Sequence, residues 1–133
     1  MSVLVDTSVW SLALRRMKTA TNRWQEEMRE LVSQSRIRII GPIRQEVLSG
    51  IRERKHFDIL KERLSVFPDA AILTSDYERA AELFNTCRAK GIQGSHTDFL
   101  ICALALHHDW EIFTTDSDFQ SFARIIGVKL YRI

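Results

Sequence analysis

Val3-Leu4-Val5-Asp6, near the start of the chain, and Ile112-Phe113-Thr114-Thr115-Asp116, near its end, are the two stretches that decide the fold. Each is a short apolar run that leads to an aspartate, and each is flanked by helix-like sequence. Such runs are typical of buried strands in a parallel sheet. Because ligands of open α/β sheets bind beyond the carboxyl ends of the strands, the two aspartates are predicted to share one edge of the sheet.

The rest of the chain alternates between strand-like and helix-like segments. We expect strands at residues 3–5, 37–40, 111–115 and 129–131, with a possible short strand at 71–73. We expect helices at about 8–17, 21–35, 42–50, 53–64, 75–90, 97–108 and 117–126, and Ser75-x-x-Glu78 has the form of a capping box. The middle of the 97–108 helix is apolar on every face, which indicates a central, buried helix. This alternation predicts an α/β fold with a parallel sheet and helices on both faces.

Size and composition indicate one globular domain that spans residues 1–133. Hydrophobic residues make up 45% of the chain and charged residues 27%, as in ordinary globular proteins. Cys87 and Cys102 lack metal-type spacing and fall in apolar helical segments, which favours reduced core thiols and a cytoplasmic location. The N-terminus has three apolar residues before an acid, so we expect no signal peptide, and no stretch is long enough to span a membrane.

The net charge of +2 is unevenly distributed. Residues 15–64 contain thirteen Lys/Arg against seven Asp/Glu, whereas residues 65–133 contain six against nine. A basic segment beside an acidic site suits a polyanion held through its phosphates. From charge alone, solvated helix faces are the favoured explanation.

Four acids have ordinary explanations when they are considered singly. Asp6 and Asp116 occupy positions that favour helix N-caps, and Asp98 and Asp118 lie in first turns, where the helix dipole stabilises negative charge. Glu46 lies about one turn into a short helix beside apolar residues, so we expect it to need a partner. A cluster of ionised carboxylates requires a cation. Oxygen ligands without a His or Cys pattern favour Mg²⁺ or Mn²⁺ over zinc, although Arg44 is an alternative partner for Glu46.

Four segments of the chain together resemble the motifs of PIN domains. Leu4-Val5-Asp6-Thr7-Ser8 is similar to the first motif, and the segment from Gly41 to Gly50, with Glu46 on its helix, is similar to the second. His96-Thr97-Asp98-Phe99 opens a buried helix of small residues, like the third motif, and Thr114-Thr115-Asp116-Ser117-Asp118-Phe119 resembles the fourth, T-x-D-x-D-F. The four motifs occur in order over nearly the whole chain, and no acid is missing. Their spacing is most similar to the VapC toxins of toxin–antitoxin pairs.

This resemblance implies a three-layer α/β/α PIN-like fold around a mostly parallel sheet of four to five strands. It implies a metal-dependent endoribonuclease that hydrolyses RNA with a metal-activated water and one or two Mg²⁺ or Mn²⁺ ions. Catalytic and metal-binding roles fall on Asp6, Glu46, Asp98 and Asp116, with Asp118 assisting through water. Ser8 and Thr114 would orient the carboxylates or the metal waters as neighbouring hydroxyls.

The resemblance also implies macromolecular partners. They are an RNA substrate, a VapB-type antitoxin and a second copy of the chain in a homodimer. Trp10 and Trp24 could line the antitoxin groove or belong to the core, and for Trp10 the core is favoured. Candidate contacts to the RNA backbone are basic residues whose alternative role is solvated surface: Arg15, Arg16, Lys18, Arg52, Arg54 and Lys55. His96 could touch substrate, and no catalytic role is assigned to any histidine.

Other functions are weighed against these residues. A haloacid-dehalogenase phosphatase needs an Asp-x-Asp after the first strand, and Asp6-Thr7-Ser8 lacks the second Asp. A receiver domain needs paired acids at that strand and a Lys near the last one. A dinucleotide enzyme needs a Gly-rich turn after a strand. A metal-dependent DNA nuclease and a non-catalytic nucleic-acid-binding module of the same fold remain as alternatives.

Overall fold

The computed structural model describes residues 1–14 and 22–133. Within them, four parallel strands form one sheet in the order β2-β1-β3-β4. The strands are β1 Val3–Val5, β2 Ile37–Arg38, β3 Glu111–Phe113 and β4 Lys129–Leu130. Residue Leu4 on the central strand β1 pairs with Arg38 on one side and Ile112 on the other. The first and third strands are therefore neighbours although more than 100 residues of sequence separate them.

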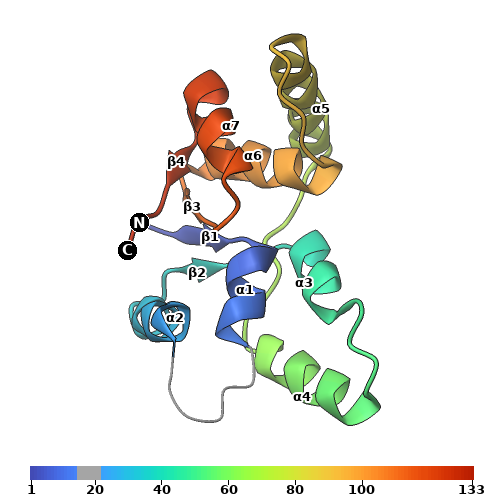
Figure 1. Cartoon of the computed structure of the whole chain (residues 1–133), viewed down its shortest axis with the longest axis vertical. Helices are drawn as coiled ribbons and strands as arrows, with labels where there is room; N and C mark the ends of the chain where they lie inside the picture. Colours follow the sequence, from blue (N-terminus) through green and yellow to red (C-terminus); the bar gives the residue numbers. More distant parts are fainter. Residues whose placement is uncertain (15–21) are drawn as a thin grey trace.

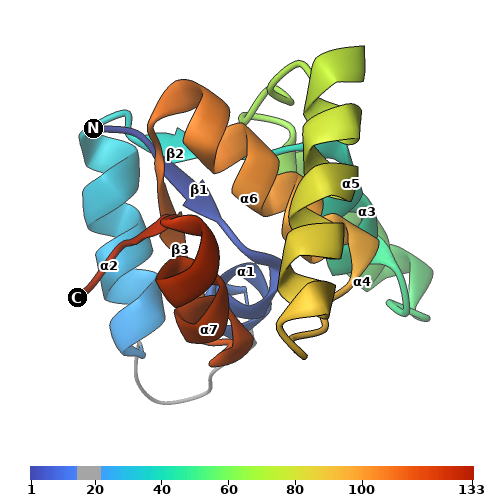
Figure 2. The ribbon, with the colours of Figure 1, turned by 90° about the horizontal axis from the view of Figure 1, so that it is seen from above.

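Helices cover both faces of this sheet (Figures 1 and 2). They are α1 Thr7–Ala13, α2 Arg23–Ser33, α3 Gly41–Leu48, α4 Arg54–Leu64, α5 Thr74–Ala89, α6 His96–His108 and α7 Asp118–Ile126. Figure 2 shows α2 and α6 on opposite sides of the strands, whereas α3 and α4 lie together beyond the end of β1 (Figure 1). The predicted α/β architecture, with a parallel sheet between helices, is confirmed, and the sheet has four strands in the described residues.

The α6 helix is the centre of the core. Its residues from Phe99 to Ala105 are all buried, as the apolar sequence predicts. One side of α6 packs against α5, and its first turn meets α7 through Phe99 and Phe122, whose ring centroids lie 4.8 Å apart. A helix that is buried all round has a fixed position, so the residues at its ends are held in fixed places as well.

Two predicted local features are wrong, and a third extends outside the described residues. Residues 71–73 form no strand: the chain touches the edge of the sheet only at a bridge between Ile39 and Asp69, and then leads directly into α5. The α5 helix is capped by Asp76 rather than by Glu78, because the Leu73 N–H donates to Asp76 Oδ2 at 2.8 Å. The α1 helix ends at Ala13, and the end predicted for it near residue 17 lies outside the described residues.

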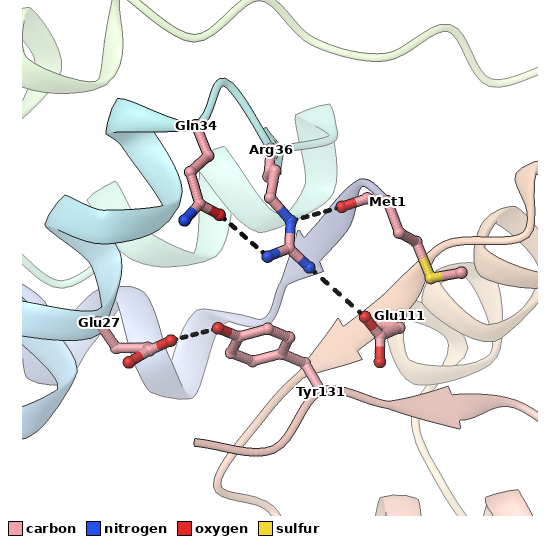
Figure 3. Close-up of polar contacts among 6 residues, drawn as sticks. All are labelled: Met1, Glu27, Gln34, Arg36, Glu111 and Tyr131. Carbon is pink, nitrogen blue, oxygen red and sulfur yellow. Dashed lines mark hydrogen bonds and ion pairs between the residues drawn. The ribbon is translucent and has the colours of Figure 1, made fainter.

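Arg36 connects Met1, at the start of the chain, with Tyr131, which follows β4 (Figure 3). Its guanidinium donates to the Met1 carbonyl at 2.7 Å, lies 3.7 Å from Glu111 Oε1 and stacks 5.5 Å from the Tyr131 ring centroid. The Tyr131 hydroxyl in turn donates to Glu27 on α2. Burial and the neighbouring Glu27 carboxylate raise the pKa of Tyr131 to about 12. This network connects the residue that follows β4 with α2 and with the residue that precedes β2.

Two further expectations concern the cysteines and membrane-spanning helices. Cys87 and Cys102 are buried free thiols, as predicted. Across residues 1–14 and 22–133, none of the helices combines the length and the hydropathy required to cross a bilayer.

Candidate active site

Asp6 lies where β1 leads into α1, and two hydroxyl groups hold its carboxylate. Ser8 Oγ donates to Asp6 Oδ2 at 2.9 Å and Thr114 Oγ1 donates to the same oxygen at 2.8 Å. The side chain is 7% exposed. The Asp6 N–H donates to the Phe113 carbonyl at 2.9 Å, so the ends of β1 and β3 are fixed together at this point. Ser8 and Thr114 therefore lie beside a carboxylate, where the resemblance places them.

The turn after β3 brings a second carboxylate to the same edge. The Asp116 N–H donates to Thr114 Oγ1 at 3.0 Å, and the Thr115 N–H donates to Ser8 Oγ at 3.1 Å. Asp116 Oδ1 accepts the N–H of Asp118 at 2.9 Å. The hydroxyl of Thr114 thus joins the Asp6 carboxylate to the backbone that carries Asp116. Asp118 is exposed at the start of α7.

Asp98 comes to this site from the first turn of α6. It forms a reciprocal capping box with Ser95: Asp98 Oδ2 accepts the Ser95 N–H at 3.0 Å, and Ser95 Oγ accepts the Asp98 N–H at 3.0 Å. Burial raises the pKa of Asp98, and the negative charges of Asp6 and Asp116 raise it further, against the lowering effect of the bonds with Ser95. Three acids from three separate segments therefore share one electrostatic environment.

Glu46 is in a different setting from the one the sequence predicts. It is exposed on α3 rather than half-buried. Its predicted alternative partner, Arg44, instead bonds to Asp69 Oδ1 at 2.9 Å and to the Leu64 carbonyl at 2.9 Å. Glu46 Oε2 accepts a hydrogen bond from the hydroxyl of Thr7 at 2.6 Å. This contact brings Glu46 to the residue that directly follows Asp6.

Helix capping explains only part of this arrangement. Asp6 occupies the N-cap position of α1 but makes no side-chain capping bond. Asp98 and Asp116 do accept backbone N–H groups near the start of a helix, so the capping interpretation holds for one oxygen of each. Glu46 has no capping role, since it lies inside α3.

The four carboxylates share one pattern of hydrogen bonding. Each uses a single oxygen: Asp6 Oδ2, Glu46 Oε2, Asp98 Oδ2 and Asp116 Oδ1. Within residues 1–14 and 22–133, the second oxygen of each makes no hydrogen bond, and no Lys, Arg or His forms an ion pair with any of the four. Buried or clustered carboxylates normally have a cationic partner. The oxygens left without one are donors of the type that hard divalent cations take.

The described residues do not already form a closed metal site. Among residues 1–14 and 22–133, no three Asp, Glu, His or Cys side chains stand in an arrangement that could hold a metal ion. The donor chemistry of the four carboxylates fits Mg²⁺ or Mn²⁺.

The predicted contacts to RNA divide into two groups. Arg15, Arg16 and Lys18 lie outside the described residues. Arg52 and Lys55 are exposed beside α3 and at the start of α4. Arg54 forms an exposed ion pair with Asp58 at 3.2 Å and stacks on Phe57, so its charge is already partly neutralised.

Several side-chain contacts in the structure are not predicted by the sequence. Thr7 lies inside the first motif, and only the fold brings it to Glu46. Asp76 is buried on α5, with its Oδ1 atom 2.8 Å from His107 Nδ1 on α6. His96 is exposed and stacks on Phe84, with ring centroids 5.3 Å apart. No sequence pattern signals these contacts, since each one depends on the packing of separate elements.

An apolar groove lies between α1, α2 and α4. It encloses about 430 Å³ and is lined by Trp10, Leu14, Met28, Leu64 and Phe67, among others. Trp10 is 3% exposed, its indole N–H donates to the Val5 carbonyl at 3.1 Å, and its ring packs on Phe67. Trp10 is therefore a core residue, as favoured from the sequence, and it also forms the floor of this groove.

Comparison with known proteins gives a consistent result. The family model described as "PIN domain" matches residues 3–125. The protein named VapC ribonuclease Mb1587, from Mycobacterium bovis, is 30% identical over 131 residues, which cover 96% of each chain. The structure of VapBC2 from Rickettsia felis bound to a promoter DNA fragment has a TM-score of 0.80 at 18% identity and covers 98% of both chains. A toxin-antitoxin complex from Klebsiella pneumoniae has a TM-score of 0.66 at 25% identity and covers 99% of this chain and 100% of that one.

Proposed function

Because this chain belongs to the PIN domain family and is a VapC-type ribonuclease toxin, we propose that it cleaves RNA with a divalent cation held by the acidic residues at the carboxyl ends of β1 and β3. Asp6, Glu46, Asp98 and Asp116 would hold Mg²⁺ or Mn²⁺, as one ion or two, and Asp118 would assist through water. The observation that carries the proposal is that, within residues 1–14 and 22–133, each of the four carboxylates keeps one oxygen free of hydrogen bonds and none is paired with a base.

The electrostatics support this proposal. The pKa of Asp98 is raised by burial and by its acidic neighbours, so this group is costly to ionise as long as no positive charge is present. A divalent cation held by the cluster would offset this cost. A bound cation would therefore stabilise the ionised form of this carboxylate cluster, whereas ordinary helix caps need no cation.

Each residue has a task in the proposed reaction. When bound, the cation supplies a nucleophilic water and neutralises charge on the scissile phosphate. The hydroxyls of Ser8 and Thr114 fix the orientation of Asp6, the carboxylate at the centre of the site. The capping box fixes Asp98 on the rigid α6 helix, where a functional carboxylate is held most accurately. The expected product carries a 5′-phosphate.

RNA is favoured over DNA as the substrate because the Mycobacterium bovis relative is named a ribonuclease. The exposed side chains of Arg52 and Lys55 are suited to contact the phosphate backbone, with a weaker contribution from Arg54. Arg15, Arg16 and Lys18 remain candidates from the sequence alone. The cytoplasm, where such RNA is found, is the proposed location.

We further propose that the groove floored by Trp10 receives an apolar segment of a VapB-type antitoxin. The Klebsiella pneumoniae neighbour is described as a toxin-antitoxin complex, and the groove is lined largely by apolar side chains. Trp24 lies half-buried beside the core of α2, so it supports this region rather than forming its floor. A homodimer completes the proposed assembly.

The first experiment is cleavage of total bacterial RNA by purified, antitoxin-free protein with Mg²⁺ or Mn²⁺. We expect discrete fragments with 5′-phosphate ends, and no fragments with EDTA or with Asp98→Asn. Asp109→Asn is the matched control, because Asp109 ends the same helix and pairs only with Lys129 at the exposed surface. Cleavage that survives EDTA, or cyclic phosphate ends, would refute the mechanism. Cleavage of DNA alone would support the DNA-nuclease alternative.

A further inference from the structure

Glu46 differs from the other three carboxylates in how it reaches the site. Asp6, Asp98 and Asp116 follow strands or open helices, and each is held by groups within its own segment or the neighbouring strand end. Glu46 lies in the middle of α3 and is exposed. A free glutamate side chain loses conformational entropy when it is fixed in one position. A functional Glu46 therefore needs an anchor outside its own helix.

Thr7 provides the one contact of this kind in the described residues. Its Oγ1 donates to Glu46 Oε2 at 2.6 Å, across 39 residues of sequence. The contact joins the first residue of α1 to α3, and the two helices pack against each other. Thr7 is itself well fixed. It follows Asp6, whose carbonyl accepts the N–H groups of Val9 and Trp10, and β-branching restricts its χ1 angle.

We infer that Thr7 is a positioning residue: its hydroxyl holds one oxygen of Glu46 and leaves Oε1 available to the cation. This inference rests on the proposed function. Among the described residues, it completes the pattern in which each of the four acids has one oxygen hydrogen-bonded and the other without a hydrogen bond. The Thr7 hydroxyl is the hydrogen-bond donor that this position requires. At 2.6 Å, its bond to the Glu46 carboxylate is as short as charge-assisted hydrogen bonds, which are stronger than neutral ones.

The test is a double-mutant cycle of Thr7→Val and Glu46→Gln, with Thr7→Ser as the conservative variant. The measured quantity is the affinity for Mn²⁺ alone, determined by calorimetry, together with kcat and KM for RNA. Valine keeps the shape and β-branching of threonine but has no hydroxyl. Thr86→Val is the matched control, because the Thr86 hydroxyl only donates to the carbonyl of Glu82 on its own exposed helix face. Thermal melting verifies that each variant is folded.

We expect Thr7→Val to weaken Mn²⁺ binding about tenfold, the usual scale for a group that orients a metal ligand. Thr7→Ser should retain wild-type affinity, and Thr86→Val should change nothing. In the Glu46→Gln background, Thr7→Val should have no further effect, since the residue would act only through Glu46.

Two results separate the failure of this inference from failure of the proposed function. If Glu46→Gln weakens Mn²⁺ binding but Thr7→Val does not, Glu46 is a ligand and Thr7 does not position it. If Glu46→Gln itself leaves Mn²⁺ affinity unchanged, Glu46 is no part of the metal site and both proposals fail at this residue. An equal loss from Thr7→Val with and without Glu46 would show that Thr7 acts through another group, which also overturns the inference.

Discussion

Asp76 and Asp98 hold the same position in two helices that pack against each other, yet their surroundings are opposite. Each lies in the first turn, of α5 and α6 respectively, and accepts the N–H of the residue before the helix: Leu73 at 2.8 Å and Ser95 at 3.0 Å. The second oxygen of Asp76 lies 2.8 Å from His107 Nδ1. The second oxygen of Asp98 has no hydrogen bond among the described residues.

This difference separates a structural carboxylate from a candidate functional one. Although burial acts to raise it, the bond with Leu73 and the neighbouring His107 lower the pKa of Asp76. Burial together with the acidic neighbours Asp6 and Asp116 raises the pKa of Asp98. Helix capping therefore accounts for one oxygen of each residue, and the partner of the other oxygen decides the role of the side chain.

The largest expected effect is on catalysis. Asp98→Asn should lower the rate of RNA cleavage by about 10²- to 10³-fold, the scale for losing a charge-stabilising group in an active site. The asparagine oxygen can still accept the Ser95 N–H, so the capping box survives. The melting temperature of the metal-free variant should equal or exceed that of the wild type, because one repulsive charge is removed. A clearly lower melting temperature would mean that Asp98 is structural, like Asp76.

The corresponding substitution on α5, Asp76→Asn, should lower the stability of the fold and leave catalysis unchanged. Asp76→Asn keeps the acceptor for Leu73 but removes the charge next to His107, whose side chain is 43% exposed. Because that partner is partly solvated, the expected loss is about 1 kcal/mol of unfolding free energy. Urea denaturation measures it, with RNA cleavage at saturating Mg²⁺ as the parallel assay. A large fall in cleavage without a change in stability would place Asp76 in the functional machinery and remove the contrast.

The smallest effect is a difference in pH dependence, measured by thermal melting of metal-free protein. Because the pKa of Asp76 is lowered in the folded state, ionised Asp76 stabilises the fold at pH values above 3.8, the ordinary aspartate value. The decrease in melting temperature caused by Asp76→Asn should therefore persist down to pH 3.8 and disappear at lower pH. Because the pKa of Asp98 is raised in the folded state, ionised Asp98 destabilises the fold. The advantage of Asp98→Asn should be greatest at neutral pH and should shrink before the pH reaches 3.8. Parallel curves for the two variants would contradict the assigned directions.

The strand ends and the central helix could be predicted because they are local patterns. Short apolar runs predict β1 and β3, so Asp6 and Asp116 are expected at one edge of the sheet. The all-round apolar character of residues 99–106 predicts α6, and the motif resemblance adds Asp98 to the site. The reason given for Glu46 was wrong: it is exposed, and its partner is Thr7 and not Arg44. The motif resemblance, rather than burial, identified that residue.

The remaining differences are one local error and contacts between separate segments. The capping residue of α5 is Asp76 and not Glu78: Ser75-x-x-Glu78 has the sequence pattern of a capping box, but the Leu73 N–H donates to Asp76. Residues 71–73 have strand-like composition, but the chain meets the sheet only at Asp69. The pairing of Asp76 with His107 depends on how α5 lies on α6, and no local pattern encodes that.

The pairing of β1 with β3 has a consequence for synthesis of the protein. Asp6 emerges from the ribosome early, but its partner hydroxyl on Thr114 and the carboxylate of Asp116 follow after most of the chain has been made. At typical rates of about 5–20 residues per second, the interval is on the order of 5–20 s. During that time the nascent chain has no complete acidic site. On the proposed function, a chain that ends before residue 116 lacks one of the four acids and is expected to have no nuclease activity.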